Sequence, residues 1–517
     1  MSITFKVTGR LESSSVVGVN LIQLIEDNWD DYTFKTSFVA IYHNALGEKL
    51  ELGAVKIGFS DQLPGWTLNS MEKQFNSLEQ GWFSLGQDVS YYKTIFESFT
   101  KDERDDYLGR MGDLVANKKF FEQVKSQKVL VDSLMRGVSL SVMNGQFRRV
   151  LEGRPALTEF EFRYVKEGCE ERAAIDVDFN VIPDSKPSTN IHVLIGRNGV
   201  GKTTLLNDMV KTIVSGADIS GGKFHLMNKW GFCSELPESY FSSVVSVSFS
   251  AFDPFVPPAD QPDRTKGVGY FYLGMKKNRL HQKDLPPKND GDLADDIIVS
   301  LKSCFSQAQK RNRWLSAIKQ LESDSNFSDM QFGRLLDMEV DEALSHARKL
   351  VDRMSSGHSI VLLTISKLID TVEEKTLVLM DEPESHLHPP LLSAFTRALS
   401  ELLQDRNAVA IVATHSPVVL QEVPRSCVWK MIRIRTEGRT DRPERETFGE
   451  NVGVLTREVF GLEVNKSGFH ELLERAVEAG GTFDSIMADY SKQLGYEAQA
   501  ILRTLVSNRD SLSEKVK

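Results

Sequence analysis

Short apolar runs, each followed by polar or small residues, are the clearest pattern in this chain. Three of them cover residues 191–195, 377–380 and 408–413 and consist almost entirely of Ile, Val, Leu, Met and Ala. Runs of this length are typical of strands that are buried on both faces of a parallel sheet. Residues 244–250 mix Val with Ser and predict a further buried strand. The pattern therefore predicts an α/β fold.

The first 150 residues predict an accessory region of the α+β type. Residues 37–43 and 50–59 read as strands, and residues 44–48 read as a hairpin-type connection between them. From residue 91 to about residue 150 the spacing of apolar positions becomes helical. No catalytic constellation occurs in this region, so we expect an accessory or oligomerisation layer.

Residues 151–424 are expected to form the catalytic head, with a helical insert at about residues 255–350. Residues 425–517 read as a strand followed by a helical tail. The further strands expected from the pattern are residues 157–164, 174–181, 268–275 and 427–434. Residues 293–321 predict one amphipathic helix.

The run at residues 191–195 leads directly into GRNGVGKT, residues 196–203, which fits the pattern G-x-x-x-x-G-K-[ST]. Its glycines let backbone N–H groups turn onto phosphates at the start of a helix near Lys202. Lys202 should reach the β- and γ-phosphates of ATP, and the Thr203 hydroxyl should bind Mg²⁺. An ordinary Gly-rich turn is the alternative, which the preceding strand disfavours. The expected nucleotide contacts are Gly196, Asn198, Gly199, Gly201, Lys202, Thr203 and Thr204.

The run at residues 377–380 ends in two carboxylates, Asp381 and Glu382. An open parallel sheet places its ligand crevice at the carboxyl ends of its strands. Asp381 fits a ligand of Mg²⁺, and Glu382 fits the general base that orients or activates the attacking water. A carboxylate that caps the next helix is the alternative, and it explains only one of the pair.

The third run is followed by Thr414, His415, Ser416 and Pro417. A lone His after a strand is usually structural, but a His at this edge of a nucleotide-binding sheet is placed to contact the γ-phosphate. The expected catalytic set is therefore Lys202, Glu382 and His415, with ATP and Mg²⁺ as cofactors and with Thr203 and Asp381 as metal ligands.

Ser355, Ser356 and Gly357 stand at the start of an apolar helix, residues 360–369. They resemble a degenerate form of the signature motif of ABC-type ATPases, which binds the γ-phosphate of ATP held by the opposite subunit. That resemblance implies a dimer with ATP sandwiched between two heads. An ordinary helix N-cap is the alternative for these residues. An AAA+ interpretation is weaker, because a long insert separates Lys202 from Asp381.

Composition excludes some functions. The chain has 517 residues, 41% of them hydrophobic, and a formal charge of −10, which does not indicate an all-over nucleic-acid binder. Local DNA contact stays open through two basic clusters and a third Arg group interrupted by acidic residues. The clusters are Lys276, Lys277, Arg279, Lys283 and Lys288, then Lys310, Arg311 and Arg313 beside Trp314; the third group is Arg433, Arg435, Arg439, Arg442 and Arg445.

The sequence shows neither a targeting signal nor a cysteine motif, and we therefore expect a cytoplasmic protein. The four cysteines lack C-x-x-C spacing, so neither a disulfide framework nor a zinc site is indicated. The N-terminus lacks a basic-then-apolar signal, and no apolar run approaches the roughly 20 residues that span a bilayer. We therefore expect no membrane association.

The sequence DEPESHLHP at residues 381–389, together with Thr-His-Ser-Pro, resembles ABC-like ATPases of the OLD, RecF and Septu kind over about residues 157–424. The resemblance implies a P-loop head with a mixed sheet, an antiparallel β-subdomain and a helical insert. It also implies a cytosolic ATPase coupled to DNA repair or anti-phage defence. An aromatic residue in such a β-subdomain often stacks on adenine, but for Phe160, Phe162 and Tyr164 core packing is the stronger interpretation.

OLD nucleases carry a metal-binding acidic cluster after the head, whereas residues 425–517 contain no D-x-D pair after a strand. The chain is thus expected not to be a nuclease and most resembles the Septu ATPase, including its retron-associated form. That resemblance implies a dimer or higher oligomer of heads, a separate HNH-type nuclease subunit and, in the retron form, a reverse transcriptase with retron RNA–DNA. A RecF-like ATPase that acts directly on DNA is the alternative function; a scaffold that binds ATP without hydrolysis is disfavoured by the complete catalytic set.

Overall fold

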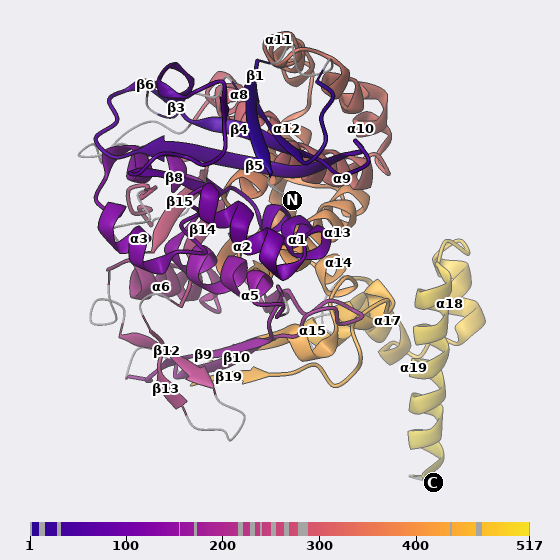
Figure 1. The fold of residues 1–517 in the computed structure, drawn as a ribbon. Helices are drawn as coiled ribbons and strands as arrows, with labels where there is room; N and C mark the ends of the chain where they lie inside the picture. The colour runs from indigo at the N-terminus through magenta and orange to yellow at the C-terminus, as the bar shows by residue number, and fades with distance from the viewer. Residues whose placement is uncertain are drawn as a thin grey trace.

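The computed structural model describes residues 3–9, 16–27, 31, 33–154, 156–169, 173–215, 221–227, 233–237, 240–249, 255–262, 268–277, 288–434, 437–461 and 468–515. Figure 1 shows the N-terminal region stacked on the head, with the C-terminal helices standing to one side. Three residues of the expected basic clusters, Arg279, Lys283 and Arg435, lie outside the described residues, as does the loop at 251–254, where ABC heads usually place a Gln that this sequence lacks.

A seven-stranded sheet forms the centre of the head, in the order β15-β14-β16-β17-β11-β18-β19. All neighbouring pairs are parallel except β18 with β19. The apolar runs at residues 191–195, 377–380 and 408–413 become β11, β16 and β17, as the pattern predicts. The strands are β11 (Ile191–Ile195), β14 (Ser243–Ser248), β15 (Gly269–Gly274), β16 (Thr376–Asp381), β17 (Val409–Thr414), β18 (Val428–Ile434) and β19 (Glu437–Asp441).

The sheet is covered on both faces. Side chains alternate along each strand, so Val378 and Met380 of β16 join one apolar cluster while Leu377 and Leu379 join another. The first cluster is closed by helices of the insert and by α12 (Ser356–Thr371) and α13 (Pro389–Arg406). The second is closed by α6 (Lys202–Ser215) and by a four-stranded antiparallel sheet. Burial on both faces explains why these strands read as continuous apolar runs.

The antiparallel sheet has the order β10-β9-β12-β13 and confirms the two alternating segments as strands. Its inward face is aromatic, and Phe162 and Tyr164 are fully buried. The ring centroid of Phe162 lies 5.1 Å from those of Phe179 and Phe241. These side chains therefore pack the core. The strands are β9 (Phe160–Lys166), β10 (Ile175–Val181), β12 (Gly222–Met227) and β13 (Cys233–Glu235).

The insert corrects one expectation, because residues 293–321 are two helices and not one. Helix α8 ends at Phe305, and Gln307 has an extended backbone with φ −133° and ψ 134° before α9 begins. The chain folds back there because Phe305 and Trp314 pack edge to face, with ring centroids 5.1 Å apart. The helices of the insert are α8 (Asp290–Phe305), α9 (Ala308–Leu321), α10 (Ser325–Met330) and α11 (Val340–Val351), with a 3₁₀ turn at Phe332–Asp337.

The N-terminal region has its own core and a six-stranded sheet in the order β7-β1-β2-β4-β5-β8. The expected hairpin is present, since β4 and β5 pair antiparallel. The main strands are β1 (Thr4–Thr8), β2 (Leu21–Glu26), β4 (Ser37–His43), β5 (Lys49–Phe59), β7 (Gln74–Phe75) and β8 (Trp82–Gly86), and a small pair is β3 (Phe34–Lys35) with β6 (Gly65–Trp66). The helices are α1 (Val89–Ser98), α2 (Lys101–Arg110), α3 (Lys118–Val124), α4 (Leu140–Val142) and α5 (Arg148–Leu151).

The sheet of the head continues past residue 424, because β18 pairs with β11 and β19 pairs with β18. The short helix α14 (Pro417–Leu420) and then α15 (Val452–Phe460) also pack on the head. Helices α17 (Phe469–Glu478), α18 (Phe483–Asp489) and α19 (Tyr496–Lys515) share a separate small core and project from the molecule in Figure 1. Among the described residues no helix combines the length and apolar character of a bilayer-spanning segment.

A buried carboxylate joins the N-terminal region to the head. Asp88, which caps α1, lies 2.8 Å from Arg313 Nη2 of α9 and 2.9 Å from Arg406 Nη1 of α13. Burial opposes ionisation, but the charges of Arg313 and Arg406 outweigh it and hold the pKa of Asp88 well below its usual value. Three parts of the chain thus meet at one ion cluster.

We expect Asp88→Asn to lower the free energy of unfolding by about 3 kcal/mol, because it leaves two buried guanidinium groups without their counter-charge. Since the folded pKa is depressed, the contribution of Asp88 is present above the unfolded pKa of about 3.9 and is lost as the pH falls below it. Urea denaturation at pH 7 and at lower pH measures both effects. The matched control is Asp405→Asn, which removes the half-exposed second partner of Arg313; an equal loss in both variants would contradict the central role of Asp88.

Candidate active site

The phosphate loop connects β11 to α6 and is shaped by its glycines. Gly199 and Gly201 have φ values of 80° and 101°, in the left-handed region that favours glycine. A Cβ at Gly196 would lie 2.4 Å from the carbonyl oxygen of Met431, so only glycine fits beside β18. Arg197, Asn198 and Gly199 are exposed, which leaves the rim of the loop open to a ligand.

Lys202 is the first residue of α6 and is buried. Its Nζ donates hydrogen bonds to the carbonyl oxygens of Gly196 at 2.9 Å and of Arg197 at 3.1 Å. Burial lowers the pKa of Lys202, while the carboxylates of Glu382 and Asp381 act in the opposite direction. The amine is therefore held at the loop and lies within electrostatic reach of the carboxylate pair. Thr203 is half-buried and Thr204 is exposed on the same helical turn.

Strand order brings the remaining predicted residues to this loop. Strand β17 lies between β11 and β16, and its last residue, Thr414, pairs with Ile195, while Ala413 pairs with Asp381. All three strands are parallel, so their carboxyl ends share one edge of the sheet. The phosphate loop, the carboxylate pair and His415 therefore lie side by side, as the sequence predicts.

Glu382 has an unusual backbone. Its φ and ψ are 45° and 58°, in the left-handed region, and its N–H donates to the carbonyl oxygen of Ala413 at 2.8 Å. Non-glycine residues in this region are uncommon and cluster at functional sites. The side chain is about one-third exposed at 31%, and its Oε1 lies 3.8 Å from His415 Nδ1. This conformation turns the carboxylate out of the strand toward the crevice edge.

Glu384 holds part of the candidate site, although the sequence analysis did not single it out. Its Oε1 accepts hydrogen bonds from Thr414 Oγ1 at 2.6 Å and from the His415 backbone N–H at 2.7 Å, and it lies 3.0 Å from His415 Nδ1. Its side chain is only 8% exposed. Glu384 therefore fixes the turn in which His415 sits. The sequence did offer a signal for this residue, because Glu384 is a third carboxylate directly after Asp381-Glu382-Pro383.

The candidate signature residues start α12. Ser355 is the N-cap, and Ser355 and Ser356 are exposed. A Cβ at Gly357 would lie 2.3 Å from the carbonyl oxygen of His386, in the 3₁₀ turn Pro383–His386 that follows Glu382. The motif is thus both an N-cap and a contact with the carboxylate turn of its own head.

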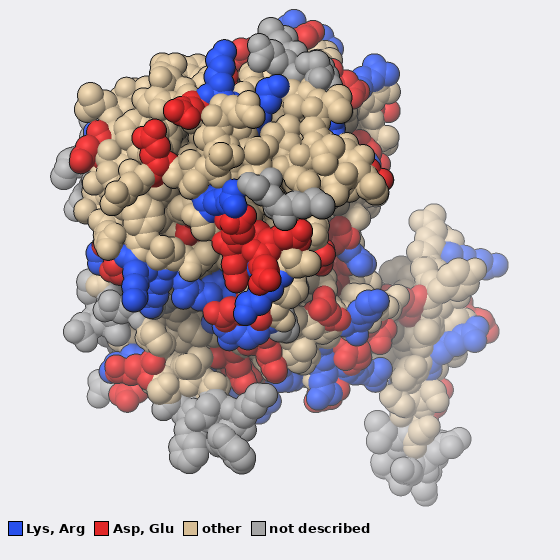
Figure 2. Space-filling model, in the orientation of Figure 1, with Lys and Arg blue, Asp and Glu red and all other residues tan. Residues whose placement is uncertain are grey.

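The basic clusters are largely occupied by contacts within the chain. Lys277 and Lys288 pair with Asp292 and Asp296 at 2.7 and 2.8 Å, and Lys310 pairs with Asp370 at 2.8 Å. On the face in Figure 2, acidic side chains gather over α2, whose members include Asp102, Glu103, Asp105 and Asp106, and basic ones lie beside them. The basic side chains of this face thus lie against acidic ones.

The second half of the head matches a known family model. Residues 276–421 match the model whose description joins "AAA domain" to a provisional "AbiEii toxin, Type IV TA system". The matched segment contains Ser355, both carboxylates and His415. Protein ea59 of Escherichia phage lambda is similar along nearly its whole length: it is 43% identical over 526 residues, covering 98% of this chain and 99% of the phage protein.

Two solved structures also resemble the chain. One, an ATP-binding cassette of an ABC transporter in its ADP conformation, is 15% identical with a TM-score of 0.30 and covers 59% of this chain and 99% of its own. UvrA2 from Deinococcus radiodurans is 12% identical with a TM-score of 0.29 and covers 57% and 39%. The phosphate loop, the sheet and the carboxylate strand give this chain a P-loop NTPase head, and its similarity over nearly the full length places it in the family of protein ea59 of Escherichia phage lambda.

Proposed function

We propose that this chain binds and hydrolyses ATP as one subunit of a nucleotide-driven switch. The observation that carries the proposal is the shared edge of β11, β16 and β17, where Lys202, the carboxylate pair and His415 meet. A chain that only bound nucleotide would have no need of Glu382, which its strained backbone aims at that edge.

Each residue of the site would have its own role in ATP hydrolysis. The glycines of the loop, with Asn198, Lys202 and Thr204, would hold the phosphates; Thr203 and Asp381 would bind Mg²⁺, which neutralises charge on the β- and γ-phosphates. Glu382 would take a proton from the attacking water, and His415 would contact the γ-phosphate. Glu384 would keep His415 in place. Asp381 and Glu382 then each have a role in the reaction, whereas helix capping would account for only one of the two carboxylates.

Two heads would complete each site. Ser355 and Ser356 are exposed at the N-terminus of α12, where free backbone N–H groups favour an anion. In an ABC-type sandwich this motif meets the ATP of the opposite head. ATP would therefore close two copies face to face, and hydrolysis would let them separate.

The finer role we propose is control of a separate effector nuclease in anti-phage defence, as the resemblance to Septu ATPases implies. An HNH-type nuclease subunit, and in a retron form a reverse transcriptase with its RNA–DNA, are the corresponding partners. The relative at 43% identity is a phage protein, so a defence of this kind would include competition between phages. Purification of the ATP-locked protein with its bound partners, followed by native mass spectrometry, tests this role.

A direct action on DNA is the other outcome of that experiment. It predicts an ATP-dependent dimer bound to DNA without a nuclease, and an ATPase rate raised by double-stranded DNA. The pairing of Lys277, Lys288 and Lys310 with carboxylates argues against it, because paired side chains neutralise fewer phosphates.

We expect Glu382→Gln to slow ATP hydrolysis by roughly 10² to 10⁴, because the amide cannot accept the proton of water. The variant should still bind ATP and should accumulate as a closed dimer with ATP and Mg²⁺. Phosphate release and analytical ultracentrifugation measure the two effects. Lys202→Ala, which should bind no ATP and stay open, is the control. Wild-type turnover in the Gln variant would exclude the general-base role.

We expect Glu384→Gln to lower kcat by roughly 10-fold while leaving the KM for ATP within about 2-fold, because loss of the negative charge beside His415 Nδ1 weakens a contact of His415 that strengthens in the transition state. The amide keeps the size of Glu384, and its oxygen can still accept from Thr414 and from the His415 N–H, so only the charge is removed. Steady-state kinetics separate the two constants. A rise in KM alone would instead indicate that Glu384 shapes the ground-state pocket. Glu401→Gln, on the exposed face of α13, serves as the matched control.

A further inference from the structure

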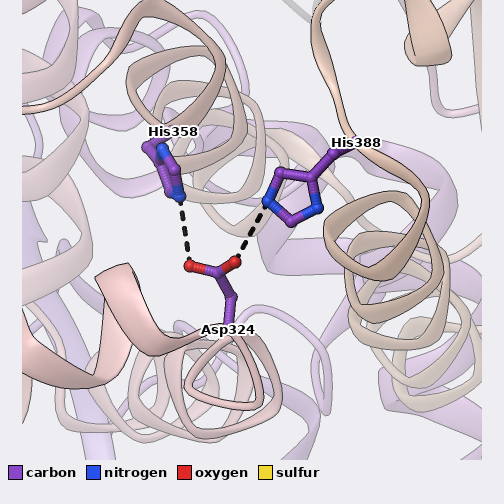
Figure 3. Close-up of side chains that lie close together, drawn as sticks. All are labelled: Asp324, His358 and His388. Carbon is purple, nitrogen blue, oxygen red and sulfur yellow. Dashed lines mark hydrogen bonds and ion pairs between the residues drawn. The ribbon is translucent and has the colours of Figure 1, made fainter.

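Behind the signature motif lies a cluster of three side chains from three helices. His358 Nε2 lies 3.1 Å from Asp324 Oδ1, and His388 Nε2 lies 3.1 Å from Asp324 Oδ2. Figure 3 shows the two imidazole rings each facing one oxygen of the carboxylate. Asp324 caps α10, His358 lies in the first turn of α12, and His388 caps α13 directly after the carboxylate turn.

The hydrogen bonds around the cluster favour one placement of its protons. His388 Nδ1 accepts the Leu391 N–H at 3.4 Å, so Nε2 carries the proton and donates to Asp324. Burial opposes ionisation of Asp324, but hydrogen bonds from His358 and from the Phe327 and Asn326 N–H groups hold its pKa below the usual value. An ionised Asp324 is only an acceptor, so His358 Nε2 is also a donor.

The hydrogen-bonded chain continues to the signature motif. When the proton of a neutral His358 ring is on Nε2, Nδ1 is an acceptor, and Ser355 Oγ lies 2.6 Å from that nitrogen. In that state the Ser355 hydroxyl donates to His358. The chain Ser355–His358–Asp324–His388 has one hydrogen for each of its three links.

The same atoms fit a metal ion less well. Ligands of this type also occur around Zn²⁺, which binds the lone pair of imidazole nitrogen. Binding through His388 Nε2 would move the proton to Nδ1, where it would oppose the N–H of Leu391 and break the cap of α13. The hydrogen-bonded chain breaks no such contact.

We propose that Asp324, His358 and His388 are positioning residues for the Ser355 hydroxyl, and that the Asp324–His388 bond couples this hydroxyl to the turn that carries Glu382 and Glu384. The inference rests on the proposed function, in which Ser355 contacts the ATP of the opposite head. A phosphate oxygen can receive the Ser355 hydrogen bond only if the hydroxyl turns away from His358 or if His358 takes up a second proton. The response of Ser355 to nucleotide thus passes through His358.

The coupling would connect the two sites of a dimer. Glu382 acts on the ATP of its own head, whereas Ser355 acts on that of the partner. A displacement of the carboxylate turn on one site would reach the other through His388, Asp324 and His358. The contact of Gly357 with the carbonyl of His386 lies beside this route and limits independent movement of the two segments.

Asp324→Asn cuts one link selectively. Oδ1 accepts three hydrogen bonds, from Asn326 N at 3.0 Å, Phe327 N at 3.2 Å and His358 Nε2 at 3.1 Å, whereas Oδ2 faces His388. The Asn oxygen will therefore keep the Oδ1 position and its NH₂ group will oppose the N–H of His388. His388→Ala removes the same link from the other side. His386→Ala, exposed in the preceding turn, is the matched control.

The test uses the full chain and measures ATP turnover against ATP concentration, with the thermal midpoint of each variant. We expect Asp324→Asn and His388→Ala each to lower kcat by roughly 10-fold with KM nearly unchanged, and to reduce the Hill coefficient to about 1. The double variant should lose no more than either single variant, since both remove one link. His386→Ala should behave as wild type.

Tautomers measured by NMR of ¹⁵N-histidine test the proton chain without ATP. In the wild-type protein we expect the proton on Nε2 of both rings. In Asp324→Asn we expect the ¹⁵N shifts of His388 to change more than those of His358. Cobalt absorption bands that disappear in Asp324→Asn would show a metal site and overturn the chain. Wild-type kcat and cooperativity in Asp324→Asn would overturn the coupling alone, whereas a wild-type protein without any ATPase activity would overturn the proposed function itself.

Discussion

The parallel pairing of β11, β17 and β16 is the constraint on which the rest of the molecule depends. Parallel strands cannot be joined by hairpins and must be covered on both faces, so each connection adds a layer. The helices of the insert close one face, and α6 with the antiparallel sheet closes the other. Because all three strands run in one direction, their ends deliver a phosphate loop, two carboxylates and a His to one edge.

The N-terminal region is attached to this arrangement by charge as well as by packing. Asp88 forms ion pairs with Arg313 of the insert and with Arg406 of α13. Arg149 pairs with Glu374, just before β16. These ion pairs are buried or nearly so, where desolvation makes an unpaired partner costly. The region is therefore fixed to both the insert and the sheet.

Motifs and apolar runs were sufficient to predict the central strands, the hairpin of the N-terminal region and the segments that meet at the site. They were sufficient because each rests on neighbouring residues. Glu384, the break between α8 and α9, and the pairing of β18 with β11 were missed, since each is fixed by partners far away in the chain. Asp324 is the clearest case: it reads as an ordinary cap of α10, and only the fold brings it to His358 and His388.

The left-handed backbone of Glu382 has a consequence for the stability of this chain. A residue with a Cβ in this conformation costs of the order of 1 kcal/mol, and glycine or asparagine would adopt it with less strain. Selection for folding alone would favour those residues at the end of β16. The carboxylate at this position therefore lowers the stability of the fold slightly, and the largely buried strands β14 and β17 on either side of β16 offset that cost.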